Sequence, residues 1–117
     1  MDLDTAFKKH GGWIEQFCTA IFNQDTLDIE IYENDNHCEL GNWLHGEGKT
    51  KYGKLNAYSR LVSSHAAFHK VAGKVVLAIN AKEFKQAEHL LSENGEFAIA
   101  SDMVRSAILK IKQEYNL

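Results

Sequence analysis

A run of apolar positions three and four residues apart, spread over residues 54–80, constrains the fold of this chain more than any other feature. Such spacing is typical of one buried face of an α-helix, which makes a turn about every 3.6 residues. The positions are Leu55, Tyr58, Val62, His65, His69, Ala72, Val76 and Ile79. No proline occurs in the chain, so nothing in it forbids a helix of this length. The sequence therefore predicts a long helix packed in a bundle.

Two further helical regions flank this one. Residues 3–23 carry an apolar stripe at helical spacing, made of Leu3, Phe7, His10, Ile14, Phe17 and Ile21. Residues 81–115 carry two stripes displaced by one position, and Asn94-Gly95 lies at the shift. We expect a kink in one long helix at that point rather than a break between two helices.

The segment between the first two helices has a different pattern. Over residues 23–36 the apolar positions Leu27, Ile29 and Ile31 alternate with polar ones, but no second strand is present to pair with them. We therefore expect an extended connector that lies on the bundle. A short helix should follow over residues 38–47, where a cluster of glycines ends it. The predicted fold is all-α, a four-helix-type bundle with a short extra helix that carries Cys38.

Composition excludes several classes of function. With 117 residues, 25% charged and 44% hydrophobic, the chain is expected to form one soluble domain over residues 1–117. A net charge of −3 and the lack of any Lys/Arg run argue against a nucleic-acid partner. No segment is apolar enough for membrane insertion or reads as a signal peptide. Cys18 and Cys38 are too few for a disulfide scaffold, so both are expected to be reduced in the cytoplasm.

Histidines at apolar positions point to a metal. His65 and His69 are four residues apart on one helix face, so their rings can converge on one ion. His10 lies within the stripe of the first helix, and Cys38 opens the short helix. Three imidazoles and one thiolate make a closed tetrahedral site for Zn²⁺. A single histidine in such a stripe is more often a core residue that donates to a carbonyl, and His37 is an alternative ligand beside Cys38.

Other notable side chains have simpler interpretations. Trp13 and Trp43 are expected to be core residues, and Cys18 a small buried apolar side chain. His45 and His89 are expected to face solvent. The chain contains no HExxH, no GxSxG and no phosphate-binding glycine loop. Because four protein ligands leave no open position on the metal, the sequence predicts a protein that is not an enzyme.

The cysteine motif also carries a resemblance. Residues 38–44 read Cys-Glu-Leu-Gly-Asn-Trp-Leu and precede Gly-Glu-Gly, which resembles the signature of the chemoreceptor zinc-binding (CZB) domains. An upstream His-x-x-Trp, here His10 and Trp13, and a downstream His-x-x-x-His, here His65 and His69, belong to the same pattern. The resemblance covers about residues 5–80 directly. Position 44 is a departure, because a leucine stands where the family often has tyrosine.

That resemblance implies a bacterial cytoplasmic sensor. Its ligands would be His10, Cys38, His65 and His69, in a four-helix-type bundle that often forms a homodimer. Gly41 would permit a tight turn beside the metal, and Trp43 would form a dry wall near it. Such domains adjust a chemoreceptor or a diguanylate cyclase, and this chain shows no output domain of its own, so it is expected to stand alone or to come from a longer protein.

The expected mechanism is a switch made by ligand chemistry. Loss of zinc or oxidation of Cys38 would free the short helix and alter the surface that a partner reads. The alternative is a structural bundle in which zinc is a permanent staple and the dimer face does the work. Affinity separates the two, because a sensor must exchange zinc at cellular free concentrations.

Overall fold

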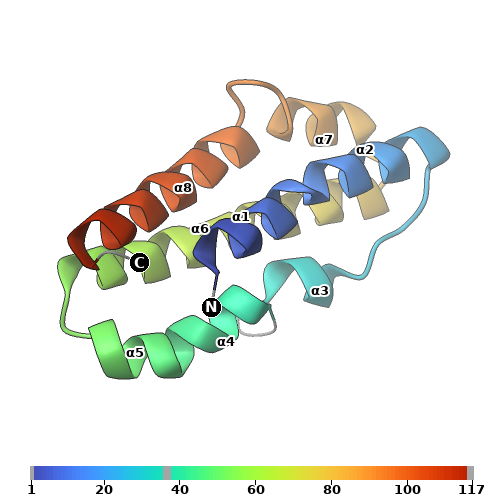
Figure 1. Ribbon diagram of the computed structural model, residues 1–117. Helices are drawn as coiled ribbons and strands as arrows, with labels where there is room; N and C mark the ends of the chain where they lie inside the picture. Colours follow the sequence, from blue (N-terminus) through green and yellow to red (C-terminus); the bar gives the residue numbers. More distant parts are fainter. Residues whose placement is uncertain (1, 36–37, 116–117) are drawn as a thin grey trace.

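The computed structural model describes residues 2–35 and 38–115, and in these ranges the regular structure is helical, as predicted. Figure 1 shows the helices in one bundle. In chain order they are α1 (Leu3–Gly11), α2 (Trp13–Asn23), α3 (Ile29–Glu33), α4 (Glu39–His45), α5 (Glu47–Tyr52), α6 (Asn56–Asn80), α7 (Phe84–Leu90) and α8 (Glu96–Tyr115).

The bundle is built around α6. The rod formed by α1 and α2 lies along one side of α6, and α7 and α8 together lie along another (Figure 1). The short helices α3, α4 and α5 cover the remaining side, with α3 and α5 packed directly on α6. This is the predicted four-helix-type arrangement, in which the fourth side consists of short helices instead of one long one.

The core follows the predicted stripes. On α6, the predicted positions from His65 to Ile79 are buried and Val62 is partly buried, as is Leu55 just before the helix. A second buried row on the same helix contains Leu61, Phe68 and Val75. Because this helix contacts neighbours on several sides, its apolar face is wider than a single stripe. Burial of that wide face places α6 at the centre of the molecule.

Capping explains where several helices begin. Asp2 accepts hydrogen bonds from the amides of Asp4 and Thr5 at the start of α1, and Asp28 accepts one from Glu30 at the start of α3. Each bond satisfies a backbone donor that lacks a partner within its helix. One predicted helix needs correction. The predicted 3–23 helix is divided at Gly12 into α1 and α2, although Gly12 itself keeps helical dihedral angles.

Two other expectations about local structure are wrong, and one is confirmed only in part. The connector is not extended throughout, because Ile29–Glu33 forms α3 with Tyr32 buried against the core. Gly46 ends the short helix α4, as predicted, but the helical structure does not stop there, since α5 follows at once and includes Gly48. The last region is broken rather than kinked: α7 ends at Leu90 and α8 starts at Glu96. For α3, packing against α6 outweighs the local pattern.

The predicted burial of several side chains can be compared with the burial in the structure. Trp13 and Trp43 are partly buried and pack against the core. Cys18, expected to be buried, is exposed on α2, whose buried residues are Phe17 and Ala20. His45 and His89 are exposed, as predicted.

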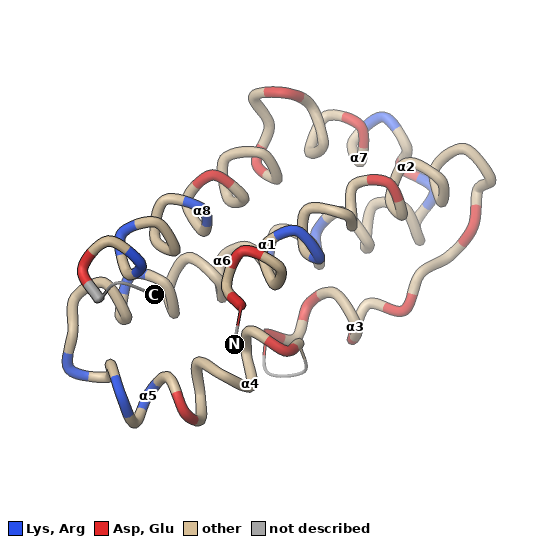
Figure 2. The backbone as a smooth tube through the Cα atoms, in the orientation of Figure 1, with Lys and Arg blue, Asp and Glu red and all other residues tan. Residues whose placement is uncertain are grey.

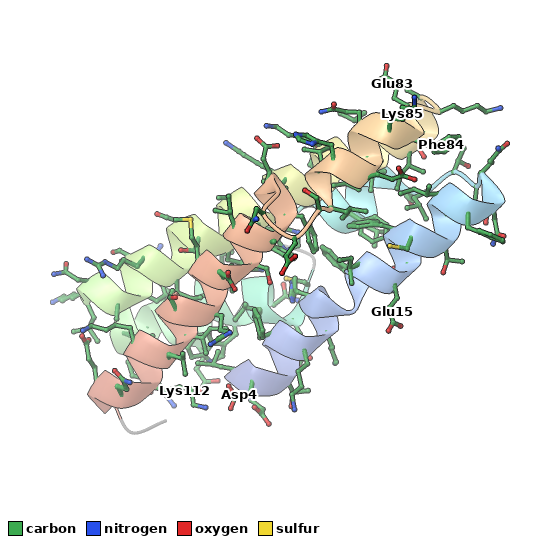
Figure 3. The ribbon with its side chains drawn as sticks, turned by 90° about the horizontal axis from the view of Figure 1, so that it is seen from above. Asp4, Glu15, Glu83, Phe84, Lys85 and Lys112 are labelled. Carbon is green, nitrogen blue, oxygen red and sulfur yellow. The ribbon has the colours of Figure 1, made fainter. Side chains whose placement is uncertain are left out.

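Charges are unevenly distributed along the chain: residues 10–48, which include α2, α3 and α4, carry Asp and Glu but no Lys or Arg, as Figure 2 shows. Ion pairs join distant parts of the chain: Lys9 on α1 contacts Glu39 on α4, and Lys74 on α6 contacts Glu96 on α8. Lys112 on α8 reaches Asp4 on α1, and Figure 3 shows the two side chains at the same end of the bundle. Among the described helices, none has the length and apolar character that a bilayer-spanning helix requires.

Candidate metal centre

The structure brings the four predicted site residues together. His10 comes from α1, Cys38 from the residue that precedes α4, and His65 and His69 from adjacent turns of α6. One ligand atom from each lies within 4.8 Å of the others. Both α6 histidines are fully buried and His10 nearly so, whereas Cys38 is partly exposed. Three parts of the chain therefore meet at one point in the bundle interior.

Four of the six distances between the donor atoms are close to those around a tetrahedral ion. His69 Nε2 lies 3.0 Å from His65 Nε2 and 3.3 Å from His10 Nε2. Cys38 Sγ lies 3.2 Å from His65 Nε2 and 3.5 Å from His69 Nε2. Tetrahedral zinc with ordinary bond lengths separates two nitrogens by about 3.3 Å and a nitrogen from a sulfur by about 3.6 Å. The donor set and its spacing thus suit zinc.

Backbone carbonyls fix the orientation of two of the rings. His10 Nδ1 lies 2.8 Å from the Ala6 carbonyl oxygen, one turn earlier on α1. His69 Nδ1 lies 2.7 Å from the carbonyl oxygen of Tyr32 on α3. An Nδ1–H that donates to a carbonyl leaves the Nε2 lone pair of a neutral imidazole free. Two such lone pairs, 3.3 Å apart, cannot hydrogen-bond to each other, and a cation between them would satisfy both.

Burial keeps the histidines neutral in the metal-free protein. Desolvation, reinforced by the neighbouring His69 and His10, lowers the pKa of His65 to about 3. Desolvation also lowers the pKa of His69 to about 4, although the Tyr32 carbonyl opposes the shift. The pKa of His10 is lowered for the same reason. Neutral imidazole is the form that binds a metal, so the rings are already in that form at neutral pH.

Cys38 joins the cluster to the start of α4. Its sulfur accepts a hydrogen bond from the Gly41 amide at 3.2 Å, as the N-cap of that helix. Burial raises the pKa of the Cys38 thiol, and the Gly41 amide partly offsets the shift. Without a cation nearby, Cys38 is therefore a thiol at neutral pH. Gly41 acts through its amide in the first turn of α4, and not through the tight turn that was expected of it.

A tryptophan encloses the cluster, but not the expected one. The ring of Trp13 lies 5.0 Å from that of His10 and 5.3 Å from that of His69, measured between centroids. Trp43, expected to form the dry wall, packs instead against Tyr52 and leaves no room for a side chain at Gly48. The sequence could have indicated Trp13, because residues three apart in a helix lie on the same face and Trp13 is three residues after His10.

Cys38 borders open space on two sides, and His10 lines one of the same cavities. Cys38 lines one cavity together with Trp13, Asp28, Glu30 and Ile31, and a second one with residues of α1 and α4. His65 and His69 are 1% and 0% exposed. An ion or a small reactant would therefore meet the sulfur before it met the α6 histidines.

Some groups around the site were not predicted, and one prediction lies outside the described residues. The carbonyls of Ala6 and Tyr32 could not be found from side-chain patterns, because any residue type offers a carbonyl. His65 Nδ1 is buried and has no hydrogen-bond partner among the described residues. His37, the alternative ligand, lies outside the described residues. His45 and His89 take no part in the cluster.

Comparison with known families gives one match. The sequence model of the family described as the chemoreceptor zinc-binding domain (CZB) matches residues 10–76, more than half of the chain. The matched range begins at His10 and extends past His69, so it includes all four clustered residues. Comparisons with curated proteins and with solved structures give no match.

Proposed function

The chain belongs to the chemoreceptor zinc-binding domain family, and on that premise we propose that it is a regulatory module that binds one zinc ion through His10, Cys38, His65 and His69. The observation that carries the proposal is the convergence of four donor atoms at separations that suit a tetrahedral ion. When bound, zinc supplies the positive charge that three lone pairs and a thiolate require, and it ties three segments of the chain together.

The position of Cys38 supports a regulatory role over a permanent staple. Its sulfur is the N-cap of α4, so any change of that atom also alters the start of a helix. The same sulfur borders two cavities, while the α6 histidines are enclosed. Oxidation of the sulfur would remove the cap, and release from zinc would leave the cap without its tie to the three histidines, so either change would loosen α4. A change in zinc occupancy or in the redox state of Cys38 would thereby reach the surface of the bundle.

A catalytic role has less support. A hydrolytic zinc site keeps one coordination position for water, and here four protein donors already fill a tetrahedron. A thiolate ligand also requires a reduced cysteine, which suits the cytoplasm. We therefore propose a non-catalytic cytoplasmic module whose output is a chemoreceptor, a diguanylate cyclase or another signalling partner, as the resemblance of its motifs implies.

A second copy of the chain is the proposed structural partner. A groove between α6 and α8 exposes Ile99 and Met103, at 56% and 54%, beside Arg60, Asp102 and Lys110. Apolar side chains flanked by both signs of charge suit a two-fold interface, in which one patch meets its own copy. Sedimentation should show a dimer, and Met103→Glu should shift it to the monomer without loss of zinc. A monomeric wild-type protein would contradict this assignment.

The zinc proposal is tested by stoichiometry and competition. Purified protein should carry about one zinc per chain, and a titration against a coloured chelator should give its dissociation constant. The double variant His65→Ala/His69→Ala should lose binding, because it removes two of the four donors from one helix. The double variant His45→Ala/His89→Ala removes two exposed histidines and should bind normally. Equal affinity in both double variants would refute the assignment.

Exchange distinguishes a sensor from a staple. A sensor should release zinc to a chelator buffered near cellular free zinc, with a change in hydrogen exchange at α4. A staple should keep its ion under the same conditions, and its removal should unfold the bundle.

A further inference from the structure

Residues that follow His69 on α6 contact the chain segment whose carbonyl orients the His69 ring. This segment is the part of the connector that lies between α2 and the end of the first described range, residues 24–35. His69 Nδ1 meets the Tyr32 carbonyl oxygen at 2.7 Å, so the ring orientation depends on where that carbonyl lies. The carbonyl lies on α3, a helix of only five residues that cannot hold its position without outside contacts. Other residues must therefore fix the connector.

Asn80, at the last turn of α6, fixes one end of the connector. Its side-chain oxygen accepts a hydrogen bond from the Leu27 amide at 2.8 Å, and its side-chain nitrogen donates to the Leu27 carbonyl at 2.9 Å. One amide side chain thus satisfies both backbone groups of one residue in an otherwise irregular segment. The pair of bonds sets both the position and the direction of the connector where it reaches α6.

Gly73 allows the other end of the connector to approach closely. A Cβ atom at this position would lie 2.9 Å from Glu33 Oε2, 3.1 Å from Glu33 Cγ and 3.2 Å from Glu33 Cβ. Glycine within a helix costs about 1 kcal/mol relative to alanine, so its presence in the middle of α6 needs a reason. The close approach of Glu33, the neighbour of Tyr32 on α3, provides that reason.

His69, Gly73 and Asn80 lie on one face of α6. They are separated by four and seven residues, which at about 100° per residue places all three within about 40° around the helix. The connector runs along this face, with Leu27 at Asn80, Glu33 at Gly73 and Tyr32 at His69. One row of α6 therefore contacts the connector at three places over about 16 Å.

We propose that Gly73 and Asn80 are positioning residues of the zinc site, which hold the connector so that the Tyr32 carbonyl orients the His69 ring. The inference rests on the proposed zinc function and adds the part of the chain that sets its affinity. It also gives zinc occupancy a second route to the surface besides α4. The His69 ring would bind the ion through Nε2 and the connector through Nδ1, so it links the ion to the connector.

Two substitutions separate positioning from plain stability. Gly73→Ala improves the helix propensity of α6 but crowds Glu33, so it should weaken zinc binding without making the helix less stable. Asn80→Ala removes both hydrogen bonds to Leu27 and also raises helix propensity. In each, the zinc dissociation constant should rise about 10-fold, the lower end of the range for groups that orient a metal ligand.

A control and a rescue complete the test. Asn56→Ala removes an exposed asparagine at the other end of α6 and should leave the dissociation constant unchanged. Glu33→Ala added to Gly73→Ala should restore most of the affinity, because it removes the atoms that the new methyl group crowds. In nuclear magnetic resonance spectra of the metal-free protein, the His69 Nδ1 proton should exchange faster with water in Asn80→Ala than in wild type.

If the wild-type protein binds zinc and both Gly73→Ala and Asn80→Ala bind it with the same affinity, the positioning role is overturned. The proposed zinc site would then still stand. A loss of affinity in Asn56→Ala equal to that in Asn80→Ala would overturn the positioning role as well. Absence of zinc from the wild-type protein would instead refute the proposed function, and the exchange of the His69 proton would still report whether Asn80 orients the ring.

Discussion

At the scale of single residues, the cluster shows how buried polar groups can be arranged for one purpose. His10 and His69 each use Nδ1 on a carbonyl and turn Nε2 toward the same point. Cys38 accepts a hydrogen bond from the Gly41 amide of α4 and lies next to the two α6 histidines. Burial disfavours charge on every imidazole and on the thiol. The arrangement is costly without an ion, because the Nε2 lone pairs of His10 and His69 face one another across 3.3 Å.

Replacing Cys38 tests this reading with a matched control. Cys38→Ala should raise the zinc dissociation constant by more than about 100-fold, since even groups that only orient a ligand contribute about 10–100-fold. A weaker site of three histidines should remain. Cys18→Ala removes the exposed cysteine on α2 and should leave the affinity unchanged. Competition titration of both variants measures the difference, and equal losses would show that the sulfur of Cys38 is not a ligand.

At the scale of elements, close approach decides where helices bend and end. Gly95 lies between α7 and α8, where a Cβ atom would come within 2.6 Å of the His89 carbonyl oxygen and 2.7 Å of that of Leu90. The last turn of α7 thus folds back on the start of α8, which explains why the region breaks instead of kinking. Gly11 differs, because a Cβ atom there would meet nothing within 4 Å.

These two glycines give opposite predictions. Gly95→Ala should lower the free energy of unfolding by about 1–3 kcal/mol, since its methyl group would collide with backbone that cannot easily move. Gly11→Ala should raise it by about 0.5–1 kcal/mol, because alanine is the better helix former and has room. Urea denaturation of both variants checks the signs. Stabilisation by Gly95→Ala would show that the α7–α8 junction is looser than described.

At the scale of the whole molecule, the cluster couples stability to pH as well as to zinc. The pKa values of His65 and His69 in the folded, metal-free protein are about 3 and 4, below the ordinary value of 6.5. Between these limits the unfolded chain binds more protons than the folded one. The stability of the metal-free protein is therefore fully present above pH 6.5 and is lost as the pH falls toward 4 and 3.

The expected loss is at most about 1.4 kcal/mol per pH unit for each histidine. Denaturation of chelator-treated protein at pH 7.5, 6 and 5 measures it. His65→Leu should make the profile flatter, whereas His89→Leu, a change at an exposed position, should leave the slope as it is. A flat profile in the wild-type protein would mean that the rings can take up protons in the folded state.

Much of this architecture could be predicted from the order of residues alone. The helical periodicity of residues 54–80 determines α6, because no other regular structure buries those positions on one face. The i, i+4 spacing of His65 and His69 determines that the two rings share a face of α6. Cys38 precedes the short α4, as its motif indicated. These features are local, since a few neighbouring residues specify each of them.

Only the tertiary structure decided the rest. The helix at Ile29–Glu33 forms because α6 provides a surface for Tyr32 and a gap at Gly73, which the alternating pattern of the connector could not show. Trp13 replaces Trp43 beside the cluster, because the packing of α2 on α6 determines which ring faces His69. The Tyr32 carbonyl comes from 37 residues away in the chain. A carbonyl has no residue type of its own, so its role depends on where the folded chain places it.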